Sequence, residues 1–121
     1  MAVYEINSLT IEKGTDFDET FTIYNEDGSL LAIDSSFVGV SKICKYPGSS
    51  TEHPFDVYLD EINSAVNISM ASTMTTELPS GRCYFDILLT YGYADTTTKK
   101  FVSGTIIVQD TSSLWAIIQL D

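Results

Sequence analysis

Residues 78–89 have the sequence LPSGRCYFDILL, and residues 100–108 have the sequence KFVSGTIIV. A turn built on Pro79 and Gly81 precedes the first run, and a polar loop containing Gly, Asp and Thr separates it from the second. Both runs are dominated by β-branched, aromatic and aliphatic side chains, which is typical of paired strands. We therefore expect the closing hairpin of a small β-sandwich in this part of the chain.

A two-residue hydrophobic periodicity extends over most of the remaining chain. Apolar side chains alternate with polar ones near residues 4–11, 17–23, 38–44, 55–59, 66–70 and 83–89, and turn-forming residues separate these segments. This pattern predicts an all-β, antiparallel β-sandwich of about seven strands in two sheets. In the third segment the alternation predicts that Val38 and Val40, with Cys44, face the core.

One segment, residues 72–78, predicts a short helical turn. Ser72 or Thr73 is a suitable amino-terminal cap, and Met74 and Leu78 have the spacing that brings two side chains to one face of a helix. Threonine is a poor helix former, so we expect a single turn with Met74 and Leu78 directed into the core.

Size and charge limit the possible functions. The chain has 121 residues, and its seventeen acidic and six basic side chains give a net charge of −11. One domain is the expectation at this length, and the acidic balance argues against nucleic acid or an anionic membrane as a direct partner. Residues 1–6 show neither a cationic segment nor a long apolar core, so we expect no signal peptide and synthesis in the cytoplasm.

The last residues depart from the sandwich pattern. We divide the chain into a β-sandwich domain over residues 1–110 and an apolar tail over residues 111–121. The apolar members of this tail are Leu114, Trp115, Ile117, Ile118 and Leu120. Two interpretations stay open: the tail adds an edge strand to its own sheet, or it docks on another subunit with Trp115 as an anchor.

Residue types that carry out chemistry are sparse. His53 is the single histidine and has no neighbouring cysteine, so we expect neither a metal site nor a catalytic triad. Cys44 and Cys83 are expected to be free, buried thiols in strands. The acidic groups at 16–19 and 56–61 match no loop that binds a metal ion. The sequence thus predicts no catalytic residue, metal or cofactor.

Two aromatic side chains in a loop are candidates for contact with a partner. Tyr91 and Tyr93 flank Gly92 between the two runs of the closing hairpin. Exposed rings of this kind anchor protein partners or stack on sugars, whereas rings that fold back over the sheet edge have a purely structural role. Together with the apolar residues of the tail, they form our predicted partner-binding set.

Several stretches together carry a family resemblance. They are residues 9–17 (LTIEKGTDF), 21–28 (FTIYNEDG), 42–45 (KICK) and 78–86, followed by Gly104. Over residues 8–110 the chain resembles small virion proteins of tailed bacteriophages, whose core is similar to the amino-terminal immunoglobulin-like domain of phage upper baseplate proteins. Here Cys83 and Phe85 stand where that family usually has an aromatic pair.

The resemblance implies a function in assembly. It implies a non-enzymatic structural protein of the tail, baseplate or neck, located in the virion and bound to other virion proteins in many copies of a symmetric assembly. Capsid decoration, as a cement protein, is one alternative. A carbohydrate- or receptor-binding module is another, and it requires Tyr91, Tyr93 and Trp115 to line one concave surface. The family offers no catalytic residues to transfer.

Overall fold

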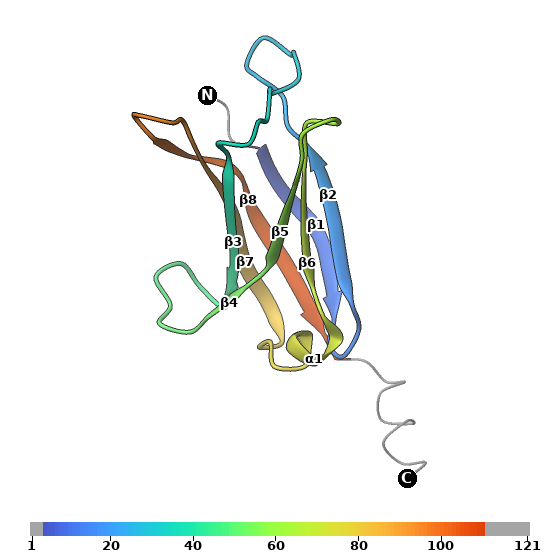
Figure 1. Ribbon diagram of the computed structural model, residues 1–121. Helices are drawn as coiled ribbons and strands as arrows, with labels where there is room; N and C mark the ends of the chain where they lie inside the picture. The colour runs from blue at the N-terminus through green and yellow to red at the C-terminus, as the bar shows by residue number, and fades with distance from the viewer. Residues whose placement is uncertain (1–3, 111–121) are drawn as a thin grey trace.

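The protein is a β-sandwich of two packed sheets, as predicted (Figure 1). The computed structural model describes residues 4–110. In spatial order the five-stranded sheet contains β1 (Tyr4–Glu12), β8 (Thr97–Gln109), β7 (Gly81–Tyr91), β3 (Val38–Cys44) and β4 (Glu52–Pro54). The three-stranded sheet contains β2 (Phe17–Thr22), β6 (Ala65–Met70) and β5 (Asp56–Asp60). The described residues thus form eight strands where about seven were expected.

The closing hairpin is confirmed as β7 and β8. These strands pair antiparallel from Gly81 opposite Val108 to Tyr91 opposite Thr97. Gly81 begins β7 with φ +102°, a left-handed conformation that favours glycine. The register shifts between Ile87 and Leu88, because Phe101 is an extra residue in β8 that has no partner in β7. At this bulge the side chains of β8 that face the core change parity.

The five-stranded sheet is not wholly antiparallel, and the prediction was wrong on this point. β1 pairs with β8 in the parallel direction, from Tyr4 opposite Val102 to Glu12 opposite Gln109. These strands come from opposite ends of the described chain, so no tight turn forces them to run antiparallel. β8 therefore has a neighbour on each side, β1 and β7.

The core lies between the two sheets. The inward side chains expected on β6 and β7 are buried: Val66, Ile68, Met70, Cys83, Phe85, Ile87 and Leu89. Phe17 and Phe55 pack across the interior with ring centroids 5.5 Å apart, and Phe21 stacks on Phe85. Burial of this kind is the main favourable contribution to folding.

In β3 the residues that face the core are the ones that were expected to face outward. Ser41 and Ile43 are buried, whereas Val38 and Val40 point away from the core and are 59% and 45% exposed. A side chain at Gly39 would lie 2.6 Å from Val57 Cγ1, because the facing sheet already fills the space over this glycine. The pairing of β3 between β7 and β4 thus presents two valines to the outside.

The predicted helical turn is present as α1 (Ser72–Thr75), but its details differ. Its amino-terminal cap is Ala71, which makes no side-chain hydrogen bond, and the backbone N–H of Ser72 donates instead to Asp16 Oδ1 at 2.8 Å. Leu78 is buried as expected, whereas Met74 is 46% exposed. Thr75 takes the inward position because it also forms hydrogen bonds with residues 13–16, the β1–β2 turn.

The sandwich has two distinct ends (Figure 1). The lower end carries α1 and the end of β8, and the upper end carries the loop after β2 and the β5–β6 turn. β2 runs from the lower end to the upper end (Figure 1). Within the described part of the chain, no helix has the length and apolar character that crossing a membrane requires.

Candidate functional site on the outer face of the five-stranded sheet

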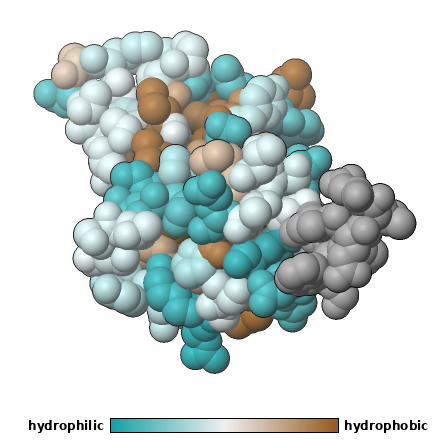
Figure 2. Space-filling view, turned by 90° about the horizontal axis from the view of Figure 1, so that it is seen from below, coloured by the Kyte–Doolittle hydropathy of each residue, from teal (hydrophilic) through white to brown (hydrophobic). Residues whose placement is uncertain are grey.

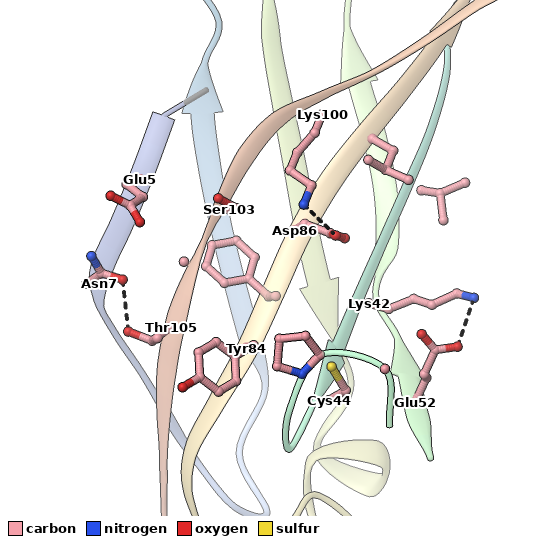
Figure 3. Close-up of a pocket in the computed structure, with 16 residues that line it drawn as sticks. Glu5, Asn7, Lys42, Cys44, Glu52, Tyr84, Asp86, Lys100, Ser103 and Thr105 are labelled. Atoms are coloured by element: carbon pink, nitrogen blue, oxygen red, sulfur yellow. Dashed lines mark hydrogen bonds and ion pairs between the residues drawn. The ribbon is translucent and has the colours of Figure 1, made fainter. Parts of the chain in front are cut away.

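The outer face of the five-stranded sheet contains a groove of about 490 Å³. Side chains from β1, β8, β7, β3 and the segment around β4 line it, and Figure 3 shows them projecting from neighbouring strands. Tyr84, Asp86 and Leu88 alternate along β7 with buried residues and therefore point outward into this groove. The same alternation that builds the core thus also builds the groove.

The charges in the groove are arranged in pairs. Lys100 Nζ lies 3.7 Å from Asp86 Oδ2, and Lys42 Nζ lies 3.3 Å from Glu52 Oε1 (Figure 3). These pairs are partly exposed, and such ion pairs contribute little to stability. Their main consequence is that the groove presents neither a cluster of positive charge nor a cluster of negative charge.

A hydrogen bond closes the side of the groove formed by β1. The Thr105 hydroxyl donates to Asn7 Oδ1 at 3.1 Å, which links β8 to β1 (Figure 3). Glu5 lies on the same strand as Asn7 and also lines the groove. This side is therefore polar, unlike the side formed by β3.

The side of the groove formed by β3 is apolar. Val40 and Leu88 line it, and they are directly opposite each other in the β3–β7 register. Val38 extends this surface toward the upper end. We call Val38, Val40 and Leu88 the outer strip. Because the outer face of a sandwich is ordinarily polar, adjacent exposed apolar side chains indicate a contact surface.

Cys44 lines the groove and is half-buried, whereas Cys83 is fully buried in the core. Both are free thiols, as expected, although the prediction that both are buried was wrong for Cys44. Burial raises the pKa of the Cys44 thiol, and the carboxylates of Glu52 and Asp86 add to this effect. Because the thiolate is the reactive form, a raised pKa makes Cys44 a weak nucleophile at neutral pH.

The structure separates the two loop tyrosines from the groove. Tyr91 is half-buried, and its ring stacks on Phe37 with centroids 4.8 Å apart. Tyr93 is 79% exposed, with its hydroxyl 3.2 Å from Ser35 Oγ. Neither tyrosine lines the groove. The Tyr93 ring is therefore accessible to a partner, whereas the Tyr91 ring is already packed against Phe37.

The other predicted partner-binding residues are Leu114, Trp115, Ile117, Ile118 and Leu120, and they lie outside the described residues. The chain reaches this segment through Asp110, at the lower end, where Lys13 Nζ lies 3.6 Å from the Asp110 carboxylate. The two neighbours of β8 leave it no free edge over most of its length.

The remaining polar candidates have structural partners. His53 is half-buried on β4, opposite Ile43. The Asp18 carboxylate accepts a hydrogen bond from Asn67 Nδ2 at 2.6 Å, and Asp60 caps the β5–β6 turn. Across residues 4–110 no three His, Cys, Asp or Glu side chains are grouped so that they could hold a metal ion.

The sequence interpretation missed the outer strip. It assigned Val38 and Val40 to the core, although Ile43 has the opposite parity on the same strand. A strand with apolar residues of both parities has two possible orientations, and the position of Ile43 was the one signal that favoured the observed orientation. The pairing of Asp86 with Lys100 depends on the β7–β8 register and its shift, which composition does not specify.

Comparisons with known proteins yield little. No protein-family model matches the chain, and no curated protein matches it. One similar solved structure is described as a nucleoside hydrolase-related hypothetical protein from Saccharophagus degradans that is associated with carbohydrate metabolism. It shares 13% identity over 89% of this chain at a TM-score of 0.34, and the match spans 23% of that protein. A likeness this distant carries no argument about function.

Proposed function

We propose that this protein is a non-enzymatic structural component of a bacteriophage virion, in the tail, baseplate or neck, and that it acts by protein–protein assembly. The observation that carries the assembly function is the outer strip. Val38 and Val40 are large exposed apolar side chains on the outer face of the five-stranded sheet, next to Leu88 and to a groove with paired charges. The resemblance of residues 8–110 to small virion proteins supports the placement in a phage particle.

The composition of this surface fits a protein partner. An apolar centre with a polar rim is the usual anatomy of a protein interface, and the rim here contains Lys42, Glu52, Asp86 and Lys100. Exposed ion pairs rearrange at little cost, so they can exchange partners when a second protein docks. One interface of this size is weak, and repeated copies in a symmetric particle supply avidity.

The alternatives differ in what they require of the surface. A capsid decoration protein would use the same chemistry at a different place in the particle. The carbohydrate-binding alternative required Tyr91, Tyr93 and Trp115 to line one concave surface, yet neither described tyrosine lines the groove. Assembly through protein contacts is therefore the better-supported proposal.

The test is to place the chain in a particle and then remove the outer strip. We expect an antibody against the recombinant protein to label purified particles at a fixed position and in many copies. A Val38→Thr/Val40→Thr double variant keeps β-branched side chains in the strand but removes the apolar surface, and its incorporation should fall at least tenfold. Quantitative mass spectrometry of the particles measures this fall.

The control is Tyr58→Thr, which removes an exposed apolar side chain, 66% accessible, from the other sheet. This variant should be incorporated normally. If particles made in cells rich in the protein contain none of it, the virion proposal is wrong. Normal incorporation of the double variant would show that the outer strip is not the contact surface.

A further inference from the structure

The upper end of the sandwich carries a second apolar surface. Tyr24, Leu30 and Ile62 are 41%, 51% and 92% exposed, and we call these three residues the end patch. Tyr24 and Leu30 are opposite each other in an isolated antiparallel bridge. The β5–β6 turn lies next to them, because the backbone N–H of Ile23 donates to the carbonyl oxygen of Ser64 at 2.9 Å.

The turn holds Ile62 in a fixed position. The Asp60 carboxylate accepts hydrogen bonds from the backbone N–H groups of Ile62 and Asn63, both at 3.1 Å, and from Asn63 Nδ2 at 2.8 Å. Ser64 then adopts φ +52°, which closes the turn. An apolar side chain presented by an ordered turn binds a partner with little loss of conformational entropy.

The opposite end of the molecule differs in character. Figure 2 views the sandwich from the lower end, where hydrophilic and neutral residues cover most of the described surface and hydrophobic ones form small separate groups. Residues 111–121 continue from this end, and residues 114–120 have the apolar sequence LWAIIQL. An apolar segment and an apolar patch thus belong to opposite ends of one molecule.

Within one copy the tail does not bring the Cα of its anchor, Trp115, to the end patch. From Phe17, the first residue of β2, to Tyr24 of the end patch the chain runs from the lower end to the upper end over seven steps, or about 23 Å at about 3.3 Å per residue. Trp115 is five residues beyond Asp110 and lies at most about 18 Å from it when fully extended. A contact within one copy would therefore involve only the residues that follow Trp115 and would leave the Trp115 Cα short of the end patch.

We propose that residues 114–120 of one copy bind the end patch of the next copy, so that the protein associates with itself head to tail. This inference deepens the proposed function, because it supplies the contact between the repeated copies of an assembly. The two halves of the interface are different surfaces, so the contact is heterologous. Successive contacts then generate a ring or a filament according to the rotation between neighbours.

The net charge of −11 sets the salt dependence of this contact. Copies with that charge repel one another, and salt screens the repulsion. The interface itself is apolar, so salt does not weaken it. We therefore expect self-association to strengthen between about 0.05 and about 0.5 M NaCl, opposite to the behaviour of a contact based on ion pairs.

The test uses the full chain and two variants, Ile62→Asp and Trp115→Asp. Sedimentation velocity from about 10 µM to about 1 mM should show that the unmodified protein grows in mass with concentration and that each variant alone stays a monomer. A 1:1 mixture of the two variants should form a dimer and grow no further. In that mixture only one pair of intact surfaces exists, the end patch of the Trp115→Asp chain and the tail of the Ile62→Asp chain.

The control is Tyr58→Asp, which introduces the same charge on an exposed side chain of the outer face of the three-stranded sheet and should associate like the unmodified protein. Matching thermal unfolding of all variants excludes misfolding as the cause. A monomeric unmodified protein at the highest concentration, or normal association of Ile62→Asp, would overturn the inference. Failure of the mixture to dimerise would also overturn it.

The two proposals fail separately. Head-to-tail association of the pure protein, without its incorporation into particles, would leave the inference intact and remove the virion function. Incorporation of the Ile62→Asp variant into particles at the normal level would leave the virion function intact and remove the inference.

Discussion

At the residue scale, Gly104 shows how a single position is fixed by backbone contact. A side chain at Gly104 would overlap the carbonyl oxygen of Ile6, because the backbone of β1 lies directly against Gly104 of β8. The register of β1 shifts between Ile6 and Leu9, directly beside this contact. The sequence singled out Gly104 as part of a family pattern, whereas the reason for glycine lies in the parallel pairing of β1.

We predict that Gly104→Ala lowers the free energy of unfolding by about 1–3 kcal/mol, because β1 must move away to admit the methyl group. Urea denaturation followed by circular dichroism measures the change. Ser103→Ala is the matched control, since Ser103 is the neighbouring residue and its side chain lines the outer groove. Equal stability of both variants would contradict the close approach.

At the element scale, the β5–β6 turn links a titrating group to the presentation of Ile62. Hydrogen bonds from Asn63, its side chain first, lower the pKa of Asp60 below its ordinary value of 3.8. A lowered pKa means that the folded turn favours the carboxylate. The stabilisation of the turn is therefore complete above pH 3.8 and is lost as the pH falls through the lower pKa of the folded state.

We predict that the backbone amide resonances of Ile62 and Asn63 shift with a common midpoint below pH 3.8 in an NMR titration. The Asp60→Asn variant should lose this transition while the rest of the spectrum stays unchanged. A midpoint at or above 3.8 would show that the carboxylate does not hold the turn in solution.

The elements differ in how far the sequence predicted them. Apart from Ala65 in β6 and Leu88 in β7, the aliphatic residues of each strand share one parity, so their inward faces were correctly assigned. β3 has apolar residues of both parities, and its neighbours decided which ones face the core. In α1, Thr75 replaced the expected Met74 because its hydroxyl accepts from Gly14 N and donates to Thr15 O, contacts that lie about sixty residues away in sequence.

At the scale of the whole molecule, the sandwich core is formed by residues 11–108. We predict that a chain ending at Thr111 unfolds with the same free energy as the full chain, within about 0.5 kcal/mol, and that its mass is that of a monomer at all concentrations. Chemical denaturation and light scattering measure the two quantities. A loss of several kcal/mol would instead show that the tail adds a strand to its own domain.

The sequence by itself determined the strands, the closing hairpin and the all-β class, because these follow from local alternation and from turn residues such as Gly81. Only the tertiary structure decided that β1 runs parallel to β8, that Val38 and Val40 face outward, and that the end patch lies opposite the end of β8. The physical reason is that alternation specifies two faces for each strand, whereas long-range pairing selects the neighbours and the face that is buried.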